Sequence, residues 1–390
     1  MTDYEAILPY AKTDAQRTAI KACIKTGSNN KAATMMGIGR RVVDKHVKRV
    51  KEYAARQGFA PEFDMKKPAP QGFHVKGVSS LYDDEGNLKI QWVKTQADKD
   101  DVLRRIIDAF TEAFSDVRGD SETVQVPAHA DCDLLTVYPM GDPHIGMYAW
   151  AEEAGEDFDC EIAERNLTNA VKNLVERSPS SHTAIVLNLG DFFHSDSLEN
   201  RSLNSGHSFD VDTRWTKVLW IGAKAMIQCV YSALAKHQQV IVKNVIGNHD
   251  THTSQALSLA LSLYFENNDR VIVDSSPSRF WFYQFGSVLI GSTHGDTVKP
   301  EQLGGIMATN RPKEWGNTEH RYWYTGHIHT KNAMELHGCL WESFRTLAAK
   351  DAWHASKGYS SGRDMVSIHH HKDFGEVERH TISLSMLRAA

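Results

Sequence analysis

Five short blocks between residues 141 and 329 carry side chains that can bind divalent metal ions. They are Gly141-Asp142-Pro143-His144, Gly190-Asp191, Gly247-Asn248-His249-Asp250, His294-Gly295-Asp296 and Gly326-His327-Ile328-His329. Carboxylate, amide and imidazole groups without thiolate suit manganese, iron, zinc or nickel. Two such ions about 3.5–4 Å apart can act on both the attacking and the leaving oxygen of a phosphoester. The blocks therefore predict a site for two divalent ions that hydrolyses a phosphoester. Manganese is the first candidate, and iron, zinc, nickel and magnesium are the others.

Each block follows a short apolar run that has the composition of a buried strand. Functional groups gather at such strand ends in open α/β sheets. Alternate residues of an extended segment point the same way, so Asp142 and His144, or His327 and His329, would aim at one cavity. The neighbouring glycines would allow sharp turns beside the ligands. We therefore expect the five blocks to converge.

The body of the chain, residues 131–390, alternates strand and helix patterns. Apolar runs rich in β-branched residues predict strands at 134–138, 183–188 and 239–244, with helices at 160–177 and 213–236 between them. From residue 271 onward the pattern becomes strand-rich, with further strands expected at 280–283 and 288–290. This alternation predicts a layered α/β or α+β body with a second sheet stacked on the first.

The five blocks in this order resemble the calcineurin-like metallophosphoesterase superfamily, over residues 131–330. The resemblance implies a β-sandwich flanked by helices and a dinuclear metal centre. It assigns one metal to Asp142, His144 and His329, the other to Asn248, His294 and His327, and the bridging position to Asp191.

The same resemblance implies roles for three further residues. His249 would protonate the leaving oxygen, and Asp250 would orient its ring. The run Gly190-Asp191-Phe192-Phe193-His194 is similar to that of SbcD-type DNA repair nucleases, in which the histidine lies beside the scissile phosphate. His194 would accordingly contact the substrate, or else support Asp191 from behind.

The first sixty residues differ from the body in charge. They hold twelve Lys and Arg against five Asp and Glu, a net charge of +7, which leaves −12 for residues 61–390. A helix from Asp14, a break at 27–30, a short helix at 31–36, a turn at Gly37 and a basic helix at 41–56 are expected. This layout resembles the helix-turn-helix heads of bacterial and phage DNA-binding proteins, so residues 1–60 would form a small all-α DNA-binding domain.

In such a head the last helix enters the major groove of DNA. The side chains expected to contact DNA are Arg40, Arg41, Lys45, Lys48 and Arg49. The alternative is a three-helix bundle whose basic side is only solvated.

Residues 61–130 are expected to connect the head to the body. Three prolines and Gly72 indicate a linker at 61–72, and strands at 73–78 and 89–94 around Asp83-Asp84-Glu85-Gly86-Asn87 predict a hairpin. Residues 97–118 have the spacing of an amphipathic helix, used for core packing or for self-association into a homo-oligomer.

Composition narrows the protein class. The 390 residues have 41% hydrophobic and 24% charged side chains, which is ordinary for a soluble protein. The five cysteines are scattered and form no C-x-x-C pair, and no signal peptide or membrane span is recognisable. We therefore expect a cytoplasmic protein, in a bacterium or a phage-infected host, without a membrane partner.

Three functions are compatible with these features. The first is a metal-dependent DNA nuclease, endo- or exonucleolytic, delivered by the head; the whole arrangement resembles phage and prophage proteins described as exonucleases or phosphoesterases. The second is a phosphomonoesterase or cyclic-nucleotide phosphodiesterase whose head serves oligomerisation. The third is a DNA-binding regulator without catalysis, which the complete ligand set and His249 disfavour.

Overall fold

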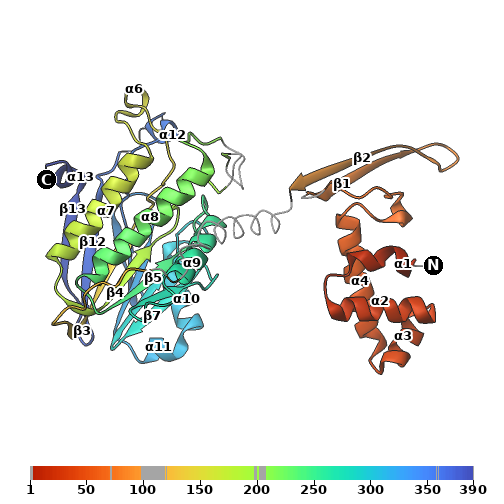
Figure 1. The fold of residues 1–390 in the computed structure, drawn as a ribbon, viewed down its shortest axis with the longest axis horizontal. Helices are drawn as coiled ribbons and strands as arrows, with labels where there is room; N and C mark the ends of the chain where they lie inside the picture. Colours follow the sequence, from red (N-terminus) through yellow and green to blue (C-terminus); the bar gives the residue numbers. More distant parts are fainter. Residues whose placement is uncertain are drawn as a thin grey trace. The chain divides into compact units, whose positions relative to one another are not determined.

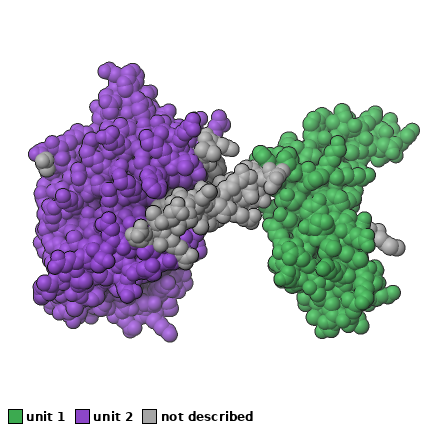
Figure 2. All heavy atoms as spheres, viewed as in Figure 1, with its two compact units in different colours: residues 1–105 green, residues 106–390 purple. Residues whose placement is uncertain are grey.

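The computed structural model describes residues 3–70, 73–97, 119, 121–196, 200–201, 208–356, 358 and 360–389. The chain divides into two compact units, residues 1–105 and 106–390 (Figure 2). Unit 1 contains the basic head and the hairpin, and unit 2 contains the five blocks.

Unit 1 begins with helices whose ends are set by capping residues. The elements are α1 (Tyr4–Ile7), the 3-10 turn η1 (Leu8–Tyr10), α2 (Asp14–Thr26), α3 (Asn29–Met36), α4 (Arg40–Arg56) and the 3-10 turn η2 (Pro61–Phe63). Thr13, rather than Asp14, caps α2 and forms a capping box with Gln16. Ser28 caps α3, so this helix begins at Asn29, inside the break expected at 27–30. Gly37, with φ of 68°, ends α3 as expected.

The helices of unit 1 pack around a small core. Ile20, Cys23, Val43, Val47 and Val50 are buried in it. These positions recur at helical spacing, so each helix turns one apolar face to its neighbours. Val42, which the spacing also placed on the inner face of α4, is instead exposed.

The predicted hairpin is confirmed. Strands β1 (Phe73–Tyr82) and β2 (Leu88–Ala97) pair antiparallel. The Asp83 carboxylate closes the turn by accepting the backbone N–H groups of Glu85 and Asn87. The helix expected at 97–118 lies outside the described residues, apart from Ala97, which ends β2.

Unit 2 contains two sheets and flanking helices (Figure 1). The six-stranded sheet has the order β13-β12-β3-β4-β5-β6. Its strands are β3 (Asp131–Met140), β4 (Ser181–Asn188), β5 (Gln239–Asn244), β6 (Val271–Asp274), β12 (Asp364–His371) and β13 (Gly375–Ser383). The five-stranded sheet has the order β10-β11-β9-β8-β7. Its strands are β7 (Trp281–Phe285), β8 (Val288–Ser292), β9 (His320–Thr325), β10 (Asn332–Leu336) and β11 (Cys339–Ser343).

The two sheets share one apolar core. Leu135, Ile185 and Ile241 from the six-stranded sheet belong to the same buried cluster as Val288 and Ile290 from the five-stranded sheet. Strands buried on both faces read as continuous apolar runs, which is why the sequence pattern revealed them. The expected sandwich of two sheets is therefore present.

Helices cover the sandwich. They are α6 (Ala151–Ala154), α7 (Cys160–Arg177), α8 (Trp215–Leu234), α9 (Thr253–Tyr264), α10 (Pro300–Asn310), α11 (Pro312–Gly316), α12 (Ala352–Ser356) and α13 (Leu384–Ala389). The long helices α7 and α8 lie side by side across the six-stranded sheet (Figure 1). Helix α7 has the bounds expected at 160–177, because Asp159 caps its first turn. Among the described residues no helix has the length and apolarity needed to span a lipid bilayer.

Candidate metal centre

All five blocks follow the carboxyl ends of strands. The first three come after β3, β4 and β5, which are parallel neighbours, and the last two come after β8 and β9, which are also parallel. Carboxyl ends of parallel strands meet at one edge of a sheet. Because the two sheets are stacked, both edges contribute to the same place, as the sequence predicted.

The first group of potential ligands consists of Asp142, His144 and His329. Their ligand atoms lie within 4.8 Å of one another. The Nε2 atom of His329 is 3.2 Å from Asp142 Oδ1 and 3.2 Å from His144 Nε2. Asp142 is fully buried and His144 is 4% exposed, so the site offers a carboxylate in an environment that excludes water.

The second group consists of Asp191, His294 and His327, with Asn248 beside it. Within this group His294 Nε2 lies 3.1 Å from Asp191 Oδ2 and 3.0 Å from Asn248 Oδ1. The same nitrogen is 4.0 Å from Asp142 Oδ1, so the two groups adjoin. The Nδ1 of His294 donates to the Leu189 carbonyl oxygen at 2.9 Å, which leaves Nε2 for a metal.

The two groups fit divalent metal ions. Metal–nitrogen and metal–oxygen bonds of about 2.0–2.2 Å place neighbouring ligand atoms roughly 3–3.5 Å apart. The distances of 3.0–3.2 Å within each group match this separation. Oxygen and imidazole donors without thiolate suit borderline ions such as Mn, Fe, Zn or Ni.

The backbone at the ligands differs from the expected extended conformation. Asp142 and His144 have φ of 46° and 47°, and His327 and His329 have φ of 71° and 54°. Asp191, with φ of 51°, is also left-handed. Side chains therefore converge because the backbone coils in the left-handed region, and not because alternate residues of a strand face the same way. Such a backbone is strained for residues with a Cβ atom and is typical of functional sites.

The glycines beside the ligands mostly provide space. Among the four glycines expected to make turns, Gly141, Gly190, Gly247 and Gly326, only Gly190 has a positive φ, 97°. A Cβ atom on Gly247 would lie 2.1 Å from Asp191 Oδ1, and one on Gly326 would lie 2.5 Å from Asp142 Oδ2. The expectation that all four make sharp turns is thus corrected: two of them leave room for the carboxylates.

The electrostatics of the second group are dominated by one buried pair. Burial raises the pKa of Asp191, but the facing His294 outweighs this and holds that pKa well below its usual value. Burial lowers the pKa of His294, yet Asp191 and Asp142 raise it to about 10. A buried carboxylate that needs a positive partner is suited to hold a cation.

His194 and His249 lie beside the first group. His144, His194 and His249 offer ring nitrogens within 4.8 Å of one another. The Nδ1 atoms of His194 and His144 are 3.3 Å apart. One of the two roles expected for His194 was to support Asp191. Its ring instead contacts His144, a residue of the first group.

Asp250 does not have the contact expected from it. The His249 ring donates from Nδ1 to the His194 carbonyl oxygen at 3.0 Å, so His194 orients this histidine. The Asp250 carboxylate accepts backbone N–H groups of Gly247, Asp191, Phe192 and Phe193. Asp250 therefore joins the third block to the second, and burial beside Asp191 raises its pKa well above its usual value.

A cavity of about 820 Å³ opens onto the two groups. It is lined by His144, Asp191, Asn248, His249 and the segment 327–330, and also by Phe209, Asp210, Lys350, Asp351 and Arg363. Phe209 was not singled out from the sequence, because a phenylalanine in a polar stretch carries no signal of what it will stack against. Arg363 is paired with Glu156.

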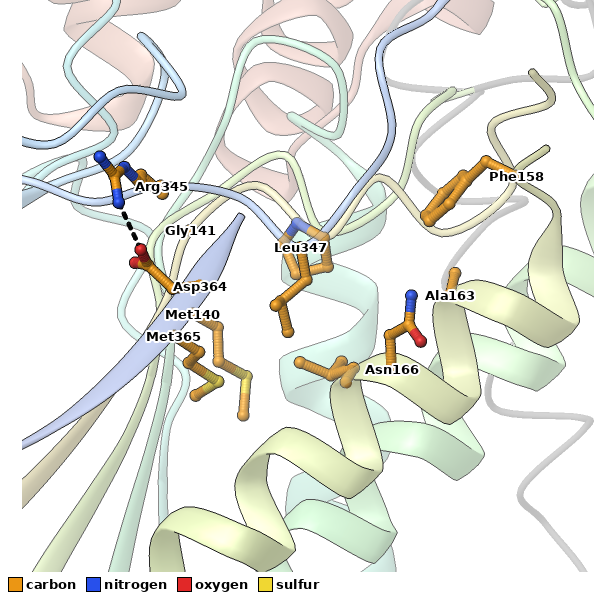
Figure 3. A pocket seen from close by; sticks show the side chains of 11 residues that line it. Met140, Gly141, Phe158, Ala163, Asn166, Arg345, Leu347, Asp364 and Met365 are labelled. Atoms are coloured by element: carbon orange, nitrogen blue, oxygen red, sulfur yellow. Dashed lines mark hydrogen bonds and ion pairs between the residues drawn. The ribbon is translucent and has the colours of Figure 1, made fainter. Parts of the chain in front are cut away.

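A second, much smaller cavity lies behind the first block (Figure 3). It is lined by Met140, Asn166, Leu347 and Met365, beside the Arg345–Asp364 ion pair. Its volume of about 10 Å³ holds at most one water molecule. Asn166 Nδ2 is buried and has no hydrogen-bond partner among the described residues. This cavity is too small for a substrate and therefore contributes only to packing.

In unit 1 the five residues expected to contact DNA are all exposed on α4. They are Arg40, Arg41, Lys45, Lys48 and Arg49. Arg40 is within 3.5 Å of Asp44 and Lys48 within 3.8 Å of Glu52, so part of this charge is locally balanced. Exposed pairs of this kind are weak and exchange readily with other partners.

Comparisons with known proteins give no family and only faint structural likenesses. No family model matches the chain, and no curated protein matches it. A predicted phosphoesterase from Streptococcus pneumoniae is 9% identical, with a TM-score of 0.25, covering 64% of this chain and 98% of that one. Vps29 complexed with Zn²⁺ from Entamoeba histolytica is 12% identical, with a TM-score of 0.26 and coverages of 64% and 98%. A dimetal phosphatase from Danio rerio is 11% identical, with a TM-score of 0.32 and the same coverages. At these values the likenesses carry no weight for function, which rests on the site itself.

Proposed function

We propose that this protein is a metal-dependent phosphoester hydrolase. The observation that carries the proposal is the convergence of seven oxygen and nitrogen donors from five strand ends: Asp142, His144, Asp191, Asn248, His294, His327 and His329. Asp142, His144 and His329 would hold one divalent ion. Asn248, His294 and His327 would hold the other, with Asp191 between them. Bound ions would supply Lewis acidity for the phosphoester and for the attacking water.

The chain itself supplies the proton that the leaving group needs. As water attacks phosphorus, the bond to the leaving oxygen breaks and that oxygen takes the electron pair. His249 lines the cavity and has Nδ1 fixed by the His194 carbonyl oxygen, so its other nitrogen, Nε2, would donate the proton. Water then returns a proton to His249 for the next cycle. His194 itself lines the same cavity, where it would contact the substrate.

Within this class we propose DNA as the substrate, with unit 1 as the delivery module. The proposal is supported by a cavity large enough for a nucleotide and by the exposed basic side of α4. As part of the same proposal, the protein acts as a nuclease in the cytoplasm and uses manganese as its metal.

A second candidate is hydrolysis of a small phosphoester, a monoester or a cyclic nucleotide. The charge balance of the cavity favours it, because Asp210 and Asp351 line the cavity as well as Lys350, and Arg363 is already paired with Glu156. A groove for a long nucleic acid would normally have an excess of positive charge.

The test of hydrolysis uses the full-length protein after chelation and reloading with Mn²⁺ or Zn²⁺. We expect cleavage of bis(p-nitrophenyl) phosphate to return with the metal and to fall in Asp191→Asn by more than about 100-fold, since even the outer partners of metal ligands are worth about 10–100-fold. Asp210→Asn, which removes a carboxylate from the same cavity outside the metal groups, should retain most activity. Equal activity of Asp191→Asn and the wild type would refute the site.

The substrate is tested with end-labelled linear DNA beside p-nitrophenyl phosphate and cyclic nucleotides. DNA binding by unit 1 is tested with Arg41→Glu/Lys45→Glu, against Lys21→Glu/Lys25→Glu on α2, which makes the same charge change elsewhere. We expect only the α4 variant to weaken binding and to reduce its salt dependence. Equal effects of the two pairs would assign binding to net charge alone.

A further inference from the structure

We propose that Phe209 is a positioning residue that holds the His249 ring in the orientation needed for proton donation. The inference rests on the proposed hydrolysis and assigns a role to a residue outside the metal groups. It would make Phe209 contribute to catalysis, although it supplies no reacting atom.

The observation behind this inference is a stack of rings at the cavity wall. The Phe209 and His249 ring centroids are 4.6 Å apart, with an interplanar angle of 26°. The Phe209 ring also lies 4.9 Å from the His194 ring. Aromatic pairs at this separation and tilt attract each other and restrict rotation of both rings.

His249 is restrained from two directions by these contacts. Its Nδ1 atom donates to the His194 carbonyl oxygen, which fixes one edge of the ring. One hydrogen bond still allows the imidazole plane to swing about that edge, and Phe209 against its face opposes this swing. The rings of His194 and His144 also lie against His249, with centroids 5.4 and 5.0 Å away, but Phe209 is the nearest ring to it. These contacts together define where Nε2 points, and proton transfer requires this nitrogen within hydrogen-bond reach of the leaving oxygen.

Phe209 lies in a backbone segment that is hydrogen-bonded to the loop after the first ligand block. Its N–H donates to the Asn200 carbonyl oxygen at 2.8 Å, and the Asp210 carbonyl oxygen accepts the Tyr148 N–H at 3.1 Å. Two residues further on, the Asp212 N–H donates to the Gly146 carbonyl oxygen at 3.0 Å. Because Gly146 follows His144 closely in sequence, the ring that stacks on His249 is anchored to the same loop as a metal ligand.

The test uses two substrates of matched shape that differ in their need for a proton. Phenyl methyl phosphate releases a phenolate that benefits from protonation, whereas 4-nitrophenyl methyl phosphate releases a stable anion. We expect Phe209→Leu to lower kcat about tenfold on the first ester and less than about twofold on the second, since general acids contribute about 10²–10⁴-fold in full. Phe209→Tyr, which keeps the ring, should restore the wild-type values.

Two further measurements separate positioning from a merely structural role. His249→Ala should show the same leaving-group selectivity, and adding Phe209→Leu to it should cost nothing more, because both changes remove one function. In the metal-free protein the ring protons of His249 should be shifted upfield in NMR spectra by the Phe209 face, and Phe209→Leu should abolish this shift.

The outcomes distinguish this inference from the proposed function. Equal losses on both esters, an effect confined to KM, or additive losses in the double variant would overturn the role of Phe209 while leaving hydrolysis established. A wild-type protein that cleaves neither ester with any of the metals would overturn both.

Discussion

At the scale of single residues, the proposed metal centre depends on neighbouring glycines, which have no side chain, as well as on its ligands. A Cβ atom on Gly247 would lie 2.1 Å from Asp191 Oδ1, and one on Gly326 would lie 2.5 Å from Asp142 Oδ2. A substitution at either glycine would therefore displace a ligand without replacing it. Such a variant tests the geometry of the site while keeping all of its ligand side chains.

We expect Gly247→Ala to weaken metal binding by at least about tenfold, because the new methyl group must push Asp191 aside. Loss of a residue that only supports a metal ligand already costs about 10–100-fold in affinity. Isothermal titration with Zn²⁺ or Mn²⁺ measures this. Gly305→Ala is the matched control: this glycine lies in α10 with open space around its Cβ position. The control should keep its metal affinity and gain about 0.5–1 kcal/mol of stability. Unchanged affinity in Gly247→Ala would contradict the geometry.

At the scale of elements, Asp196 connects the loop after β4 to the start of α9. Its buried carboxylate accepts the backbone N–H groups of His252 and Thr253 and the Thr253 hydroxyl. The His252 ring lies 2.7 Å from it. The third block ends three residues before this helix begins, so the cap also fixes the loop that carries Asn248 and His249.

We expect Asp196→Ala to lower the free energy of unfolding by about 2 kcal/mol, because hydrogen bonds to a charged acceptor contribute about 1.5–3 kcal/mol. Urea unfolding in the presence of a chelator measures this without the contribution of bound metal. Asp210→Ala, which removes an exposed carboxylate from the wall of the large cavity, should change stability by less than about 0.5 kcal/mol. Equal losses in the two variants would show that the cap contributes nothing particular.

The elements were largely predictable from sequence, and the contacts between them were not. Strands β3, β4 and β5 are short apolar runs, and a ligand block after each one indicated where the site would form. The left-handed backbone of Asp142 and His144 has no such signature, because an Asp-x-His pattern does not specify φ. Asp250 contacts Phe192 and Phe193 across 57 or more residues, and Phe209 stacks on His249 only in the folded chain. Such contacts depend on tertiary structure.

At the scale of the whole molecule, three buried histidines make the sandwich sensitive to acid. His237 lies against Tyr138, His370 against Tyr324, and His369 against Thr136. Burial is the main reason that the pKa of His237 is lowered to about 4 and those of His369 and His370 to about 3. His369 and His370 belong to the run of three histidines at 369–371, which forms the end of strand β12.

The sign of the effect follows from the pKa values. An unfolded histidine binds a proton below about pH 6.5, whereas these three stay neutral in the fold, so their stabilisation is complete above that pH and declines as the pH falls. Between pH 7.5 and 5.5 each should cost about 1.4 kcal/mol of unfolding free energy. Replacing one, by His370→Gln or His237→Gln, should reduce the pH dependence by that amount in chelator-containing urea titrations. A pH dependence identical to that of the wild type would contradict the neutral state.

The left-handed φ values at five of the seven proposed ligands have a consequence for transplanting this centre. Each such residue costs about 1–3 kcal/mol, which only the surrounding architecture can sustain. A synthetic peptide containing one block would relax into ordinary conformations and lose its affinity. Grafting the same side chains onto an unrelated scaffold would fail for the same reason, unless the recipient were also given the coiled loops and the small neighbours that accommodate them.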